Sequence, residues 1–255
     1  MTHVIPSNHV AAASLNSSFD PGDLAGSDLR VWIDYTDSAS LTMNGGNIQA
    51  AMDKSGNGNN AIQLSGARQP RLDAGIIGGK QAAFFKYGGA TTQWMTIANN
   101  ASVQTKRLHL FAVIQRFADT GSDEYFAYKT TGGNQSWEFR VHSTDILLAT
   151  VSVDGTVTIA PGTGPALAVG TPYIVELVFD GTKGRVIRNN VTGSASALVG
   201  DINTNNVDIT LGGPNFSSNG LYGYLTEFLM FANPQQGLER ASVLAYLSSK
   251  YGIAV

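Results

Sequence analysis

Side chains able to do acid–base or metal chemistry are few and scattered along this 255-residue chain. The histidines have no zinc-ligand spacing, and Asp123 and Glu124 are adjacent, so in a strand they would point to opposite faces. Glu227 lies inside an apolar run, where it is expected to pair with backbone or an arginine. Because no G-x-S-x-G nucleophile motif or phosphate-binding loop occurs, we expect no catalytic residues and no enzyme activity. The residues considered are Glu124, Glu138, Glu176, Glu227, Glu239, His3, His9, His109 and His142.

Carbohydrate binding would need aromatic side chains on exposed loops, where a ring can contact a sugar. The candidates near predicted loops are Trp94, Tyr125 and Tyr222. The alternative for each is packing at the edge of the core, the commoner position of large aromatic residues. The sequence therefore names three candidate ligand-binding residues and leaves both interpretations open.

Composition excludes several classes of function. With 29 glycines, 14% charged and 43% hydrophobic residues, the chain is typical of a turn-rich globular domain. A net charge of −3 gives no electrostatic case for nucleic-acid binding, and the lack of cysteine excludes disulfides and cysteine-based zinc sites. No stretch has the apolar length of a membrane span, and the first residues lack the features of a secretory signal peptide. We expect synthesis in the cytoplasm without signal-peptide export.

The stretch 29–61 organises the chain. Two apolar runs, Leu29–Ile33 and Ile48–Met52, are followed by a turn cluster at Asp53–Asn60. Glycine adopts positive φ at little cost, and Asp, Ser and Asn side chains bond to nearby backbone, so this cluster predicts one compact, rigid loop. A polar surface loop is the interpretation that the loop chemistry alone favours.

These residues, D-K-S-G-N-G-N-N-A at Asp53–Ala61, resemble the opening of laminin-G-like domains. Gly79–Phe85 is similar to a G-x-x-A-x-x-F element of that family, Gly223–Phe231 to its late strand and Glu239–Ile253 to its closing helix. The resemblance implies an all-β, two-sheet antiparallel jelly-roll sandwich of the concanavalin-A-like kind with one C-terminal α-helix. It does not specify function, because this fold hosts lectins, glycanases and structural modules.

The resemblance also raises two kinds of site. The glycanase branch uses an E-x-D-x-x-E triplet, which places two carboxylates on one face of a strand, and no such triplet occurs here. Several laminin-G-like domains bind calcium through loop oxygens, which Asp53, Asn57 and Asn59 would supply in this chain. One carboxylate among amides is a weak site for a hard cation, so we expect no cofactor and favour turn formation for these residues.

Strand signals fill the middle of the chain. The apolar run Leu108–Gln115 predicts a strand buried on both faces. Asp154-Gly155, between alternating β-branched residues, predicts a hairpin with a two-residue turn, and Asn189-Asn190 predicts a second hairpin. Strand signals without a βαβ rhythm favour an antiparallel sandwich.

The one convincing helix is predicted at Leu238–Tyr251. Leu244, Leu247 and Tyr251 recur with helical spacing, Lys250 lies in the last turn, and Gly252 is placed as a left-handed cap.

The chain divides into residues 1–27 and a domain over residues 28–255. The first segment is polar and lacks periodicity, and it is interpreted either as an attachment arm ordered by a partner or as a strap along its own domain. Its candidate partner-binding residues are Val4, Ile5, Val10, Leu15 and Phe19.

Three functions remain. The first is a non-enzymatic structural protein of a phage particle, a head- or tail-associated decoration or fibre jelly roll present in many copies. It would contact other virion proteins through the arm, and weak binding to host or environmental glycans would gain avidity from copy number. The second is a carbohydrate-binding module of a bacterial surface system. The third, a glycoside hydrolase, is disfavoured by the missing carboxylate triplet.

Overall fold

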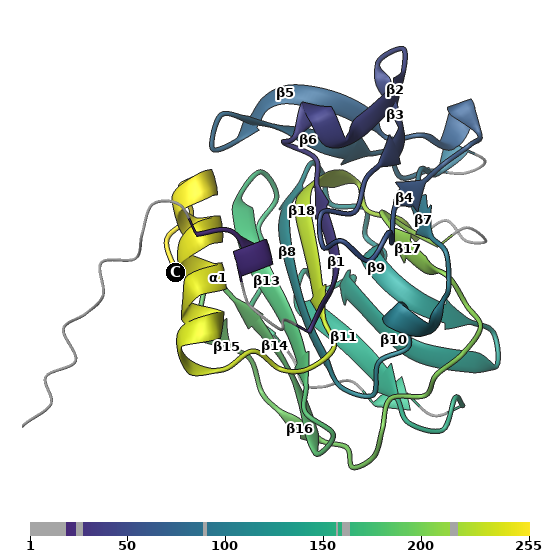
Figure 1. The fold of residues 1–255 in the computed structure, drawn as a ribbon, viewed down its shortest axis with the longest axis vertical. Coiled ribbons are helices and arrows are strands. Elements are labelled where there is room, and N and C mark those ends of the chain that lie inside the picture. Colours follow the sequence, from purple (N-terminus) through teal and green to yellow (C-terminus); the bar gives the residue numbers. More distant parts are fainter. Residues whose placement is uncertain (1–18, 24–27, 89–90, 157, 160–163, 215–218) are drawn as a thin grey trace, which may run out of the picture.

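A computed structural model describes residues 19–23, 28–88, 91–156, 158–159, 164–214 and 219–255 (Figure 1). The named strands pair antiparallel, and the α-helix among the described residues is α1 (Gly237–Tyr251). An all-β class with a C-terminal helix is therefore confirmed. The strands are β1 (Leu29–Asp34), β2 (Leu41–Asn44), β3 (Asn47–Ala51), β4 (Ala61–Ile62), β5 (Arg71–Ile77), β6 (Lys80–Phe85), β7 (Met95–Ile97), β8 (Leu108–Arg116), β9 (Glu124–Thr131), β10 (Asn134–Val141), β11 (Leu147–Ser152), β12 (Thr158–Ile159), β13 (Pro172–Phe179), β14 (Lys183–Arg188), β15 (Val191–Thr192), β16 (Ser196–Ala197), β17 (Ile209–Leu211) and β18 (Gly223–Phe231). Short 3-10 helices span Pro21–Asp23, Ser38–Ser40, Gly66–Arg68 and Ala101–Val103.

Strand β8 is central to a continuous hydrogen-bonded network, pairing with β18 on one side and with β13 on the other. The far edge of β18 pairs first with β6 and then with β1, and β13 continues to β14. A second run of paired strands goes through β3, β4, β7, β17, β9, β10 and β11. One residue pair, Asn47 with Arg71, joins β3 to β5 and so connects the two runs.

Two hydrophobic clusters lie on opposite faces of the central strands, because successive side chains of a strand point to opposite faces. The larger cluster includes Leu110 and Ile114 of β8 together with Phe126 of β9 and Phe139 of β10. The second includes Phe111 and Val113 of β8 with side chains of α1. In Figure 1 the helix accordingly lies along one side, and β8, β13 and β18 separate it from β9, β10 and β11.

The burial of β8 confirms the prediction that this segment is a strand buried on both faces. Every residue from Leu108 to Ile114 is buried, and Gln115 is half-buried.

The hairpin predictions have mixed outcomes. Asn189 and Asn190 both adopt positive φ (44° and 64°) between β14 and β15, so the predicted asparagine turn is confirmed. The predicted hairpin forms, since β11 pairs with β12, but the two-residue turn at Asp154-Gly155 is wrong, because the last residue pair is Ser152 with Thr158. Gly155 has φ 84°, and a Cβ there would lie 2.8 Å from the Asn203 side chain, so the glycine fits a packed loop rather than a tight turn.

The C-terminal helix matches its prediction closely. It begins one residue earlier than expected, at Gly237, and ends at Tyr251. Gly252 follows in the left-handed conformation, with φ 67°, and its N–H bonds to the Ser248 carbonyl.

The segment 1–27 is described only in part. Val4, Ile5, Val10 and Leu15 lie outside the described residues. The Phe19 ring packs edge-on against Tyr246 of α1, with ring centroids 6.4 Å apart. The described end of this segment therefore contacts the chain's own helix.

Candidate binding site

Four aromatic side chains gather at the end of the β18 face that α1 leaves uncovered. They form what we call the aromatic surface: Phe84 of β6, Phe117 directly after β8, Tyr222 directly before β18 and Tyr224 near the start of β18. The Phe117 ring centroid lies 5.3 Å from that of Tyr222 and 5.4 Å from that of Phe84. Phe117 is 51% exposed and Tyr222 is half-buried, whereas Phe84 and Tyr224 are buried beneath them. An exposed aromatic ring that continues into a cluster of further rings is a candidate binding surface.

Strand geometry explains the cluster. Tyr222 and Tyr224 are two residues apart and share a face, and Tyr224 pairs directly with Phe84 across the ladder. Gly223 between the tyrosines lets the backbones approach, because a Cβ there would lie 2.4 Å from the Gln115 carbonyl oxygen.

Polar groups border the aromatic surface on one side. The Arg71 guanidinium lies 4.9 Å from the centroid of the Phe84 ring and forms a two-point ion pair with Asp73. The Tyr224 hydroxyl donates to Asp73 Oδ2 at 3.3 Å. Burial, followed by the Asp73 charge, raises the pKa of Tyr224, so this hydroxyl stays a donor at neutral pH. Apolar rings beside ordered polar groups suit a ligand that has both C–H faces and hydroxyls.

A buried ion pair holds the two outermost rings. Arg116 is 2% exposed, and its Nη2 donates to Glu124 Oε1 at 2.8 Å. The other Glu124 oxygen accepts from the Tyr222 backbone N–H at 3.4 Å, and the Phe117 N–H donates to the Tyr222 carbonyl at 2.8 Å. Arg116 Nη1 also bonds to Asp145, at 2.6 Å. The Arg116–Glu124 ion pair therefore fixes the backbone from which Phe117 and Tyr222 project.

Of the three aromatic candidates from the sequence, Tyr222 belongs to the aromatic surface and the others lie elsewhere. Trp94 is half-buried, with the Arg68 guanidinium 4.3 Å from its ring centroid. Tyr125 is half-buried beside Arg140, at 5.1 Å, and burial raises its pKa to about 12.

Sequence reasoning missed Phe84 and Phe117 as site residues. Phe117 gives one usable signal, an aromatic residue directly after the buried β8 run. Phe84 gives none, because it reads as a core position.

Two carboxylates, Asp34 and Glu227, lie together with their pKa values shifted in opposite directions, as in an acid–base pair. The two residues face each other in the β1–β18 ladder and share the Lys250 ammonium, at 2.9 and 2.8 Å. Burial raises the pKa of Glu227, whereas Lys250 and Thr36 outweigh burial and hold the pKa of Asp34 below its ordinary value.

This carboxylate pair is nevertheless enclosed by α1. Glu227 has no exposed surface, and each of its oxygens accepts from donors within the chain, so a substrate has no access to it. The predicted arginine or backbone partner of Glu227 is wrong: Lys250 of α1 is its cation. The donors to Glu227 are Trp32 Nε1, Tyr246 Oη, Lys250 Nζ and Tyr251 Oη.

The loop proposed for calcium uses its oxygens on its own backbone. The Asp53 carboxylate accepts from the N–H groups of Trp32, Ser55 and Asn59 and from the Ser55 hydroxyl, at 2.7–2.9 Å. Asn57 and Asn59 donate their amides to the carbonyls of Leu29 and Arg30. The turn interpretation accounts for these contacts. Among the described residues no cluster of three His, Asp or Glu side chains is arranged to hold a metal ion.

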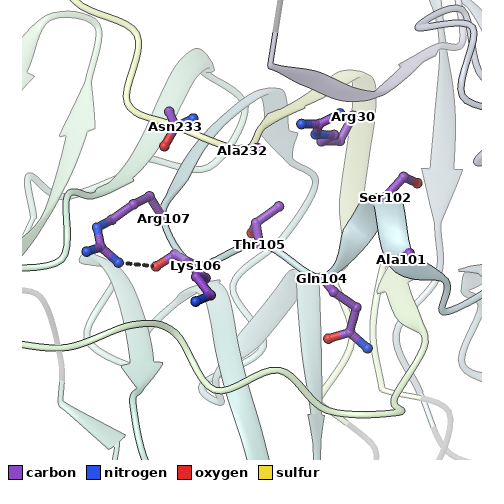
Figure 2. A pocket seen from close by; sticks show the side chains of 9 residues that line it. All are labelled: Arg30, Ala101, Ser102, Gln104, Thr105, Lys106, Arg107, Ala232 and Asn233. Carbon is purple, nitrogen blue, oxygen red and sulfur yellow. Dashed lines mark hydrogen bonds between the residues drawn. The ribbon is translucent and has the colours of Figure 1, made fainter.

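A polar pocket of about 440 Å³ lies between the start of β1, the segment before β8 and the end of β18 (Figure 2). Arg30, Lys106 and Arg107 line it, but each has an acidic neighbour. Lys106 and Arg107 both pair with Asp201, at 3.1 and 2.5 Å, and Arg30 lies 3.8 Å from Asp28. Each basic group of this pocket is therefore already in contact with a carboxylate, and Lys106 and Arg107 share one.

No family model matches the chain, and no curated protein matches it in sequence, so the laminin-G-like assignment stays a prediction. Among the described residues, no helix is both long and apolar enough to cross a membrane.

Solved structures with a similar fold include three binding or accessory domains. The binding domain of Paraclostridial Mosquitocidal Protein 1 has a TM-score of 0.62 and 12% identity, covering 90% of this chain and 53% of that chain. Domain 4 of AbnA, a GH43 extracellular arabinanase from Geobacillus stearothermophilus, was solved in complex with arabinotriose. Its TM-score is 0.57 and its identity 13%, and the match covers 86% of this chain and 98% of that chain. The binding domain of Botulinum neurotoxin DC, in complex with rat synaptotagmin II, has a TM-score of 0.59 and 10% identity. The match covers 87% of this chain and 52% of that chain.

This chain thus spans about half of the two toxin chains and nearly all of the arabinanase domain chain. At such identities the likeness shows a shared fold and no more.

Proposed function

We propose that this chain is a non-enzymatic, glycan-binding β-sandwich that binds saccharides on its aromatic surface. The observation that carries the proposal is the exposed Phe117 with the half-buried Tyr222, packed edge-on and tilted against buried Phe84 and bordered by the Arg71–Asp73 ion pair. Further support comes from the arabinanase domain, which has a similar fold and whose structure contains a bound arabinose trisaccharide.

Within this proposal the strands form the two-sheet jelly roll that the sequence resemblance implies. The single residue pair between β3 and β5 supports a division of the network at that point. The larger hydrophobic cluster also takes side chains from both runs of strands, as the space between two packed sheets would.

Replacing Phe117 or Tyr222 with Ala is expected to weaken glycan binding about tenfold each, because each ring contributes stacking of about 1–1.5 kcal/mol. Binding would be screened on a glycan array and measured by calorimetry for the best neutral oligosaccharide. Trp94→Ala is the matched control, since it removes an aromatic ring outside the aromatic surface. Equal losses in Trp94→Ala and Phe117→Ala would contradict the proposal.

The absence of catalysis is a separate part of the proposal. It is supported by the contacts of the strand glutamates, each of which accepts hydrogen bonds from groups of this chain. Glycans that bind should release no reducing ends on long incubation, and turnover that disappears in Glu124→Gln or Glu138→Gln would refute this part. The glutamate contacts are those of Glu124, Glu138, Glu176 and Glu227.

We place this module on a phage particle, attached through residues 1–27. Support comes from the sequence resemblance to laminin-G-like domains, which occur in phage and bacterial surface proteins. A bacterial surface module that binds carbohydrate is the alternative location.

Deleting residues 1–18 is expected to leave the melting temperature nearly unchanged and to abolish incorporation into particles. This deletion keeps Phe19, whose ring contacts α1, so folding contacts of the described residues are retained. Thermal melting and particle incorporation would be measured on the same variant. Normal incorporation, or a large loss of melting temperature, would indicate that the segment is a strap rather than an arm.

A further inference from the structure

A second pocket, of about 360 Å³, lies between the β13–β14 turn and the start of α1. Its lining includes Lys183 and Arg185 from β14 and Arg240 from α1. The volume is at the lower end of the range for small-ligand sites. The chain as a whole has a net charge of −3, so three cations around one pocket are a local departure from its overall balance.

Two of these cations have no ion-pair partner among the described residues. No described carboxylate lies within 4.0 Å of Lys183 Nζ or of the Arg185 guanidinium. The one acid of the lining, Asp180, directs its Oδ1 to the backbone N–H groups of Thr182 and Lys183, at 2.8 and 2.9 Å. Lys183 and Arg185 therefore make no direct contact with a described carboxylate, and Asp180 acts on Lys183 only at longer range.

The third cation is fixed in place with one nitrogen unused. Arg240 donates from Nε and Nη2 to the two oxygens of Glu176, both at 2.8 Å, and Nη2 also reaches Asn190 Oδ1 at 3.1 Å. Within the described part of the chain, Arg240 Nη1 has no acceptor. A guanidinium held by a bidentate carboxylate loses little freedom when it binds a further oxygen, so Nη1 is a ready donor.

Buried hydrogen bonds behind the lining residues hold Gln235 and Arg240 in position. His109 is fully buried; its Nε2 donates to Glu176 at 3.0 Å and its Nδ1 accepts from the Gln235 N–H at 3.0 Å. Burial lowers the pKa of His109, in keeping with a neutral ring that has one donor and one acceptor nitrogen. The Glu176 charge is matched by Arg240, and the Gln235 backbone that lines the pocket is held in position.

We propose that this pocket binds an oxyanion, the carboxylate or sulfate group of an acidic saccharide. Lys183, Arg185 and Arg240 Nη1 provide the donors, and the choice of a saccharide as carrier rests on the proposed function. The pocket of Figure 2 also has three basic residues, but each of them is in direct contact with a carboxylate, Asp201 or Asp28. Lys183 and Arg185, which touch no described carboxylate, distinguish this pocket from that of Figure 2.

The test compares glucose 6-sulfate and glucuronate with glucose, by calorimetry or NMR titration at fixed ionic strength. The wild-type protein is expected to bind each acidic sugar at least about tenfold more tightly than glucose, the effect of one or two charge-assisted hydrogen bonds. Arg185→Gln and Lys183→Gln should each remove most of this preference. Lys106→Gln removes one positive charge from the pocket of Figure 2 and should keep the preference within about twofold.

Two outcomes would overturn the proposal: no preference for the acidic sugars in the wild-type protein, or equal losses in Lys106→Gln and Arg185→Gln. The Phe117→Ala variant separates this proposal from the proposed function. If Phe117→Ala leaves neutral-glycan binding intact while Arg185→Gln removes the acidic preference, the aromatic site fails and the oxyanion site stands.

Discussion

Arg116→Met is expected to lower the free energy of unfolding by about 3–5 kcal/mol, the cost of leaving a buried carboxylate without its cation. Glu124 has no exposed surface, and Arg116 Nη2 at 2.8 Å is its cation. Because Glu124 also accepts the Tyr222 N–H, the substitution should weaken glycan binding at temperatures where the variant stays folded. Urea unfolding and calorimetry would measure the two effects.

The control for Arg116→Met is Arg30→Met. The Arg30–Asp28 ion pair is exposed, with side chains 34% and 36% accessible, so its loss should cost at most about 1 kcal/mol. The double variant Arg116→Met/Glu124→Leu removes both charges and should regain part of the lost stability. A double variant whose loss equals the sum of the two single losses would contradict the account of an uncompensated buried charge.

The elements that sequence reasoning predicted well are those that local pattern determines. The β8 run, the asparagine hairpin and the helix with its glycine cap each depend on residues within about fifteen positions, where periodicity and turn chemistry decide the structure. The two-residue turn predicted at Asp154-Gly155 is absent even though its signal is local, and Gly155 lies against Asn203, a contact between distant residues that no local pattern predicts.

The candidate site depends on contacts between residues far apart in the chain, and no local pattern predicts these. The aromatic surface brings Phe84 beside Tyr222 only through the register of β6 on β18. In the same way, Lys250 was expected to serve the helix end, whereas the β1–β18 register places Asp34 and Glu227 next to it. Register over such separations is set by the whole fold.

Raising the pH from 7.5 to 10.5 is expected to stabilise the wild-type protein by about 3 kcal/mol relative to Lys129→Met. Lys129 is 1% exposed, and its ammonium contacts neutral oxygens: Asn99 Oδ1 at 2.7 Å, the Asn205 carbonyl at 3.3 Å and the Val207 carbonyl. Burial lowers its pKa to about 8. Between pH 8 and the ordinary lysine value of 10.5, the unfolded chain binds more protons than the folded one, so stability rises with pH.

The comparison with Lys129→Met is needed because buried tyrosines act in the opposite direction. Burial raises the pKa of Tyr35 and Tyr251, so their ionisation in the unfolded chain destabilises the wild-type and variant proteins alike at high pH. Urea unfolding of both proteins at several pH values would give the difference curve. Lys106→Met, at an exposed lysine, is the control and should give a difference from the wild-type that is nearly independent of pH. If the difference in unfolding free energy between the wild-type protein and Lys129→Met is also independent of pH, the prediction is wrong. Lys129 would then titrate near its ordinary pKa, because its three oxygen partners offset burial.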